Sequence, residues 1–279
     1  MYFHLTARVG GVVLTQVGIA AVVWGSFRRA FPEALAVVLM PNHPHLIVSA
    51  RDGATARHRL SAALSGITRY CRRRPDLGDP HWAVAPIKDP IPDRRHLARE
   101  IRYVLLNPCR AGLVADPLEW LWTTHRDVVG AVLDPWVTAP HLAAALGRPR
   151  AKFVQEHHAY VSGDPSVCVA GTPLPRRAVA TAPTSVGLSQ VLAAALAAPR
   201  ASAEDLQRRS LTRRLFVQLA AEHGWNRPVM LARMCRVARQ SVHRLLGVPL
   251  DRAVLDPATL CLGDERLMRP YLPRQSAPQ

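Results

Sequence analysis

The chain has 279 residues, with 36 Lys and Arg against 20 Asp and Glu, a formal net charge of +16 and a sequence pI near 11.1. Hydrophobic residues make up 49% of it, enough to build cores, which excludes a wholly disordered protein. The positive charge favours a polyanionic partner, either nucleic acid or an anionic membrane surface. Nearly all the basic residues are arginines, and a GC-rich genome is the alternative explanation of that bias.

The cysteines and the first apolar stretch both indicate a cytoplasmic protein. The five cysteines are odd in number, widely spaced and never form CxxC, so we expect reduced thiols rather than a disulfide framework or a zinc knuckle. The stretch Val9 to Phe27 is about as long as a membrane span, but glycines, Thr15 and Gln16 interrupt it. We therefore expect a core helix there, no leader segment and no membrane partner, in a bacterial, nucleoid-associated protein.

The first half of the chain predicts strands and helices in the order β-α-β-β-α-β-α. The opening "MYFHLTARV" alternates like a strand, and residues 12–30 look helical. The apolar runs "EALAVVLM" and "HLIVSA" are joined by the short turn "PNHP", which indicates an antiparallel hairpin.

Two amphipathic helices follow, separated by the short strand "HWAVAPIK". Residues 55–74 place Leu60, Leu64, Ile67 and either Tyr70 or Cys71 at helical spacing. Residues 93–107 form the second helix, with Asp93 as its N-cap and Pro108 as its stop. The order predicts an α+β fold with a ferredoxin-like split βαβ antiparallel sheet and helices on one face.

The composition changes beyond residue 150. We expect a first domain at 1–150, a linker region rich in Pro, Ala and Thr at 151–187, and a small all-α domain at 188–279. In the last domain, "VMLARMC", "RVAR" and "QSVHRLLG" have the form of a helix-turn-helix, whose second helix enters the major groove of DNA; an ordinary three-helix bundle has the same apolar spacing. The candidate DNA contacts there are Arg239, Gln240, Ser241, His243 and Arg244.

Two histidines interrupt the third strand. His43 and His45 are two residues apart, so both side chains project from one face. They are either core imidazoles bonded to the backbone or two ligands of a metal ion. Tyr103 and Asn107 share a face of the later helix. An asparagine oxygen suits Mg²⁺ or Mn²⁺, and a tyrosine beside a cation can be a nucleophile, although spacing alone equally allows Tyr103 to be a packing residue.

Two long segments, in order, resemble a known family. "MPNHPHLIVS" at 40–49 and "IRYVLLNPCRAGLVADPLEWLWTTHRDVVG" at 101–130 are similar to "MPNHVHLL", "YIHLNPVRAGLV" and the closing "WSSYRAYLG"-like run of the REP-associated tyrosine transposases. That family belongs to the single-tyrosine transposase superfamily of HUH nucleases. The resemblance covers roughly residues 2–130, since "YFHLTARV" also stands where the family has its "YHVTSRG"-like first strand.

The resemblance implies a metal-dependent endonuclease and strand-transferase that cuts single-stranded DNA at or near hairpins of repetitive palindromes. Tyr103 would form a 5′-phosphotyrosine, and His43, His45 and Asn107 would hold Mg²⁺ or Mn²⁺. No nucleotide cofactor is expected, and no GxxxxGK[ST] sequence occurs. Arginines would contact the single strand: Arg69, Arg72, Arg73, Arg74 and Arg110. A solvated helix end is the alternative for the first four, and capping of helix carbonyls for Arg110.

One departure leaves a second function open. Pro44 stands between the histidines, where the family has Val, and proline donates no hydrogen bond to a sheet. A domesticated, catalytically weakened protein that binds repetitive palindromic DNA is therefore the alternative. A metal or small-molecule module unrelated to nucleic acid is a third, which the net charge opposes. The expected partner is single-stranded or hairpin DNA, with a monomer or a homodimer both open.

Overall fold

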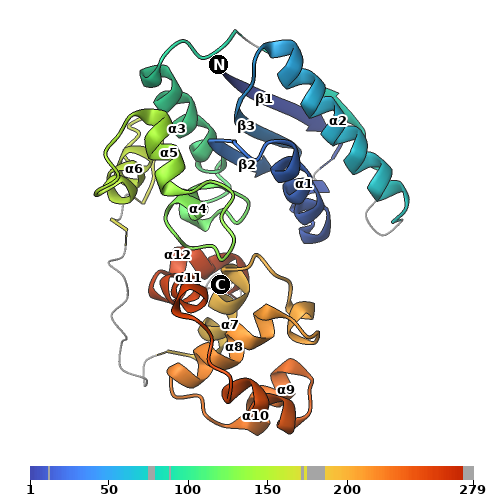
Figure 1. The fold of residues 1–279 in the computed structure, drawn as a ribbon, viewed down its shortest axis with the longest axis vertical. Coiled ribbons are helices and arrows are strands. Elements are labelled where there is room, and N and C mark those ends of the chain that lie inside the picture. Colours follow the sequence, from blue (N-terminus) through green and yellow to red (C-terminus); the bar gives the residue numbers. More distant parts are fainter. Residues whose placement is uncertain (12, 75–78, 88, 171–172, 175–185, 273–279) are drawn as a thin grey trace, which may run out of the picture. The chain divides into compact units, whose positions relative to one another are not determined.

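The computed structural model describes residues 1–11, 13–74, 79–87, 89–170, 173–174 and 186–272. The chain divides into two compact units. The first unit comprises residues 1–129 and 135–173, and the second comprises 130–134 and 174–279. Figure 1 shows the ribbon of both, and each is described here by itself. Among the described residues, none of the helices combines the length and apolarity needed to span a membrane.

The first unit is built on a four-stranded antiparallel sheet, which confirms the α+β class. Its strands are β1 (Tyr2–Val9), β2 (Ala36–Met40), β3 (His43–Ser49) and β4 (Trp82–Val84), in the spatial order β2-β3-β1-β4. Strand β3 thus lies between β1 and β2, an order compatible with the expected split βαβ arrangement. In β1 every second side chain is buried, as the alternating sequence predicts.

Helices cover both faces of this sheet. Helix α1 (Val17–Ala30), which follows the 3₁₀ turn Val13–Thr15, packs against α2 (Gly53–Arg72) on one face of the sheet. Helix α3 (Arg94–Arg110) lies against the other face (Figure 1). Phe3 of β1 lies next to Gly53 at the start of α2, whereas its neighbour His4 meets Tyr103 of α3. The expectation of helices on one face is therefore wrong for α3. Because every residue of β2 is buried, other elements must cover both faces of the sheet at this strand.

Helix α3 begins as predicted and ends later than predicted. Asp93 caps it, since its Oδ1 accepts a hydrogen bond from the backbone N–H of His96 at 2.8 Å. Pro108 does not stop the helix, which continues to Arg110. Because proline has no N–H, the Val104 carbonyl loses its helical donor. The Asn107 side chain supplies a substitute, with Nδ2 donating to Val104 O at 3.4 Å.

The segment "WTTHRDVVG" closes the outer edge of the sheet. The Thr124 N–H donates to Val37 O at 2.9 Å, and the Val37 N–H donates to Thr124 Oγ1 at 2.9 Å. The Leu39 N–H donates to Trp122 O at 3.0 Å. Element η3 (Pro117–Glu119) precedes this segment, and α4 (His125–Val128) lies within it. The segment is therefore a structural part of the sheet.

Replacing Thr124 with valine is expected to destabilise the protein by about 1–3 kcal/mol, because the buried Val37 N–H then lacks an acceptor. Urea denaturation followed by circular dichroism measures this. The Thr124→Ser variant keeps the hydroxyl and should unfold near the wild-type midpoint. Equal midpoints for Thr124→Val and wild type would contradict this role.

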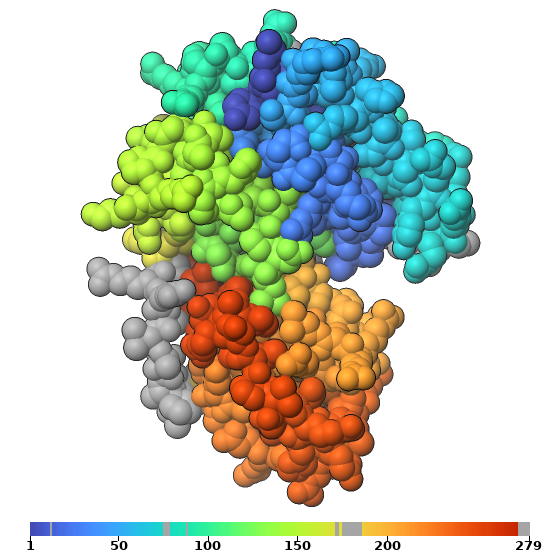
Figure 2. Space-filling model, in the orientation of Figure 1, coloured from blue at the N-terminus to red at the C-terminus, as the bar shows by residue number. Residues whose placement is uncertain are grey.

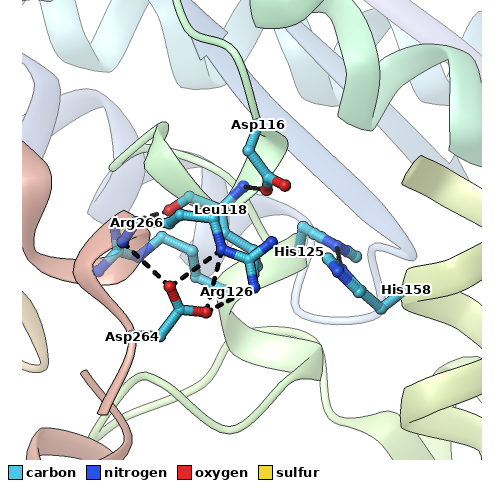
Figure 3. A network of polar contacts seen from close by, with 7 residues as sticks. All are labelled: Asp116, Leu118, His125, Arg126, His158, Asp264 and Arg266. Carbon is cyan, nitrogen blue, oxygen red and sulfur yellow. Dashed lines mark hydrogen bonds and ion pairs between the residues drawn. The ribbon is translucent and has the colours of Figure 1, made fainter. Parts of the chain in front are cut away.

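Two more helices complete the first unit. Helices α5 (Ala139–Leu146) and α6 (Phe153–Ser162) pack on each other and on α3. The predicted linker of 151–187 is thus too long at its start, because α6 lies within it; residues 171–172 and 175–185 of that linker lie outside the described residues. The helix α6 could not be predicted from an apolar pattern, because two of its buried positions are histidines, His157 and His158. Figure 3 shows one of them in a hydrogen bond, His125 Nε2 to His158 Nδ1 at 3.0 Å.

Burial lowers the pKa of His157 to about 4, with a smaller contribution from His158. The unfolded chain takes up this proton near pH 6.5 and the folded chain near pH 4, so stability should fall as the pH drops through that window. The loss is on the order of 3 kcal/mol by pH 4. Chemical denaturation at pH 7 and pH 4.5 tests this, with His157→Phe expected to lose less stability than wild type. Identical pH dependence in the two proteins would refute the assignment.

In the second unit, the secondary structure of the described residues consists of helices. Its α-helices are α7 (Leu188–Ala197), α8 (Leu211–Glu222), α9 (Pro228–Cys235), α10 (Arg239–Leu246), α11 (Arg252–Gly263) and α12 (Glu265–Met268), with 3₁₀ turns at Ala203–Leu206 and Arg269–Tyr271. Helices α9 and α10 are joined by three residues, and Arg236 at their junction has a φ of 51°. Helix α11 packs on α7, and Arg266 at the start of α12 pairs with Asp264 at 2.6 Å (Figure 3).

Candidate active site

The two histidines of β3 lie side by side on the face that α3 covers. Their ring centroids are 4.8 Å apart and the rings are nearly perpendicular. Pro44 between them points to the opposite face. Its partner in β2 is Leu39, whose N–H points away from β3 and donates to Trp122 O. On the other side of β3, the pairing with β1 ends at Thr6 and His45, one residue before Pro44. Proline therefore occupies a position where the sheet needs no N–H from β3.

Tyr103 joins the histidines from α3. Its ring centroid lies 6.2 Å from that of His45, with the rings edge to face. The side chain is 39% exposed, so its hydroxyl-bearing ring belongs to an accessible surface beside the buried His45. Three of the four residues predicted from sequence are thus brought together by β3 and α3.

Two residues that sequence reasoning missed extend the site. His4 of β1 bonds to His45, with 2.9 Å between His4 Nε2 and His45 Nδ1. The other nitrogen of His4 bonds to Glu100 of α3, with 3.1 Å between Nδ1 and Oε2. The centroid of His4 is also 6.0 Å from that of Tyr103. A chain of hydrogen bonds therefore runs from Glu100 through His4 to His45.

This chain determines which nitrogens remain available. A carboxylate only accepts hydrogen bonds, so His4 donates from Nδ1, and the Nε2 of a neutral His4 then accepts the proton on His45 Nδ1. His43 likewise donates from Nδ1 to Asn42 Oδ1 at 2.6 Å. When His4 is neutral, both strand histidines therefore carry their proton on Nδ1 and present the lone pair of Nε2.

The electrostatics keep both rings neutral. Burial lowers the pKa of His45 to about 3, with further contributions from His4, His43 and Arg8. Burial and Arg8 also lower the pKa of His43. Neutral imidazole is the form that binds a cation, so near neutral pH the pair needs no proton loss before it acts as a ligand.

Asn107 lies one turn beyond Tyr103 on α3 but is not joined to the histidines. Its Nδ2 is held by the Val104 carbonyl, which leaves the Oδ1 oxygen as its acceptor. In the described part of the chain, no hydrogen bond links it to His43 or His45, and no group of three or more His, Cys, Asp or Glu side chains is placed to hold a metal. The atoms that could coordinate a metal are the imidazole nitrogens of His43 and His45 and the amide oxygen of Asn107, a set of ligands that suits a divalent ion.

Two arginines border the site. The Arg110 guanidinium lies 5.1 Å from the centre of the Tyr103 ring and donates to Asp164 at 3.0 Å. These two contacts replace the carbonyl capping considered from sequence. Arg8 lies on β1, on the same face as His4, and is exposed. Arg8 therefore adds positive charge near the histidines, and Arg110 places a guanidinium beside Tyr103.

The other predicted DNA contacts lie elsewhere. Arg69, Arg72, Arg73 and Arg74 are exposed at the end of α2, where Arg72 Nε donates to Asp79 at 3.0 Å. Arg69 and Arg72 line a hollow that also includes Trp82. On α10, Arg239, Gln240, His243 and Arg244 are exposed and Ser241 is half-buried. Arg239 Nε donates to His243 Nε2 at 3.2 Å, so two of these side chains form one unit on the helix surface.

The sequence held a signal for the missed residues. In the opening strand, His4, Thr6 and Arg8 occupy alternate positions between buried apolar residues. An alternating strand next to β3 places such side chains on the histidine face. Glu100 gave no comparable signal, because its role depends on how α3 crosses the sheet.

Comparisons with known proteins add one structural similarity. A solved structure of a REP-associated tyrosine transposase bound to a REP hairpin is 22% identical to this chain, with a TM-score of 0.35, over 46% of this chain and 78% of that one. No family model and no curated protein matches the chain. At this identity and TM-score, function has to be inferred from the site itself.

Proposed function

We propose that the first unit is a metal-dependent tyrosine endonuclease and strand-transferase for single-stranded DNA, acting at or near hairpins. The single observation that supports this is the pair of adjacent histidines with lowered pKa values beside the exposed Tyr103. The motif resemblance of residues 2–130 to REP-associated tyrosine transposases agrees with this geometry. As part of this proposal, we assign the four-stranded sheet of the first unit to the ferredoxin-like type.

The reaction would proceed by attack of the Tyr103 hydroxyl oxygen on a phosphorus of the DNA backbone. The new O–P bond replaces the bond to the 3′ oxygen, so the products are a 5′-phosphotyrosine and a free 3′-hydroxyl. His43, His45 and Asn107 would hold the divalent ion, which when bound withdraws charge from the nonbridging phosphate oxygens. Arg110 and Arg8 would add positive charge beside the reacting phosphate. The covalent intermediate conserves the energy of the phosphodiester bond, so rejoining needs no ATP.

The second unit would bind duplex DNA next to the cut. Helices α9 and α10 have the lengths and the short connection of a helix-turn-helix, and α10 exposes Arg239, Gln240 and Arg244. Phosphate contacts from such side chains would hold a hairpin stem while the first unit acts on the adjoining single strand.

A denaturing gel tests the proposal. The purified protein is incubated with 5′- and 3′-labelled single-stranded hairpins and Mn²⁺, with and without EDTA. We expect a protein–DNA adduct that survives denaturation, disappears with EDTA, is destroyed by protease and retains only the label 3′ to the cut. Tight, salt-sensitive hairpin binding without any adduct would instead identify the alternative, a DNA-binding protein that no longer cuts.

A further inference from the structure

A second basic feature of the first unit lies along the N-terminal half of α3. A cavity of about 510 Å³ opens between α3, α5 and α6, within the size range of ligand sites. Figure 2 shows that these segments contribute adjoining surface on one face of the unit. Five of the eleven residues that line the cavity are arginines: Arg94, Arg95, Arg99, Arg102 and Arg148.

The charges around this cavity are unbalanced. Glu156 is the one acidic residue among those that line it. Arg102 is paired with Asp164 at 3.5 Å. In the described part of the chain, Arg95, Arg99 and Arg148 are exposed and form no ion pair. Unpaired guanidinium groups around one hollow are suited to phosphate, which they bind through two parallel hydrogen bonds.

The walls between the arginines are aromatic and apolar. Tyr160 is partly exposed and stacks on the Arg102 guanidinium at 4.5 Å. Phe153 lies parallel to His157 at 5.4 Å, with the buried His157 Nε2 lacking a partner among the described residues. An arginine-rich hollow with aromatic walls fits a nucleotide, whose phosphate needs cations and whose base needs a stacking surface.

The cavity also has a defined relation to Tyr103. Arg99 lies four residues before Tyr103 on α3, about 6 Å along the helix axis and on the same side. Arg95 lies one further turn away. A single strand with one phosphate at Tyr103 therefore passes Arg99 and Arg95 in succession if it runs along α3 toward its N-terminus.

We infer that this cavity binds the nucleotide adjacent to the cleavage point, holding its phosphate with Arg95, Arg99 and Arg148 and its base against Tyr160. The inference rests on the proposed function, because the path of the single strand along α3 is measured from a phosphate at Tyr103. The cavity would be a second place at which the enzyme binds the single strand. It assigns a recognition role to α5 and α6, which carry no part of the Tyr103 site.

Fluorescence anisotropy tests the inference with two DNA probes, a blunt hairpin and the same hairpin with a single-stranded extension. The Arg99→Ala/Arg148→Ala protein should bind the extended hairpin about tenfold more weakly than wild type and the blunt hairpin equally well. The logarithmic salt slope for the extended probe should drop by about 1.4, as expected for two lost single-strand phosphate contacts. Arg29→Ala/Arg57→Ala removes the same charge from exposed positions and should bind like wild type.

Adduct formation measured in the same samples separates the two ideas. If the Arg99→Ala/Arg148→Ala protein binds both probes like the control and forms adduct at the wild-type rate, the cavity is not a nucleotide site, while the proposed cleavage stands. If the extended probe is selectively lost but wild type never forms an adduct, the cavity binds single strands and the cleavage proposal fails. Equal loss of both probes would also overturn the inference, because it would indicate a general charge effect.

Discussion

Tyr103→Phe is expected to abolish covalent adduct formation, with strand cleavage at least about 10³-fold slower than in wild type. Phenylalanine keeps the ring that packs against His45 and Arg110 and removes only the oxygen that would attack the phosphate. The protein should therefore fold and bind hairpin DNA as before. Single-turnover cleavage of a labelled hairpin, with binding measured in parallel, gives both quantities.

Tyr70 provides a matched control for this change. It is also an exposed helical tyrosine, 45% exposed against 39% for Tyr103, but it lies on α2, which covers the other face of the sheet. Tyr70→Phe should cleave at the wild-type rate. Cleavage by Tyr103→Phe at a rate near that of Tyr70→Phe would mean that a water or another residue attacks the phosphate, and the assignment of Tyr103 would fail.

Removing either His4 or the Glu100 carboxylate is expected to weaken Mn²⁺ binding by about 10–100-fold. Neither residue would touch the ion. They hold the proton of His45 on Nδ1, so that Nε2 keeps its lone pair. Without that chain, His45 exchanges between tautomers and ring orientations, and part of the population presents an N–H to the cation.

Titration of the apoprotein with Mn²⁺, followed by electron paramagnetic resonance, measures this affinity directly. Glu100→Ala and His4→Ala should both weaken binding, while Glu100→Gln should recover part of it because the amide oxygen still accepts from His4. Glu222→Ala, in the second unit, removes an equivalent carboxylate and should leave the affinity unchanged. Unchanged affinity in both His4→Ala and Glu100→Ala would show that the hydrogen-bonded chain does not position His45.

Much of this architecture could be predicted from the sequence because the relevant signals are local. Alternation in β1, the apolar runs of β2 and β3 and the Asp93 cap all depend on neighbouring residues, and the structure has each of them. The end of α3 could not be predicted, because Asn107 supplies the hydrogen bond that Pro108 cannot.

At the site itself, one part could be predicted from the sequence and another could not, for physical reasons. The facing of His43 and His45 follows from strand periodicity, whereas the bond between His4 and Glu100 joins residues 96 positions apart. It requires both the β1–β3 register and the placement of α3 on the second face of the sheet. Periodicity alone does not choose between the two faces of a doubly covered sheet, which is why α3 was expected on the wrong one.

The closure of β2 by residues 122–124 has a consequence for self-association. An open edge strand offers a row of N–H and C=O groups onto which another chain can add as a further strand. In β2 those groups are already used, at Val37 by Thr124 and at Leu39 by Trp122. Along this edge the folded first unit is therefore protected against the addition of a strand from another chain, the step by which sheets exchange strands and grow into fibrils.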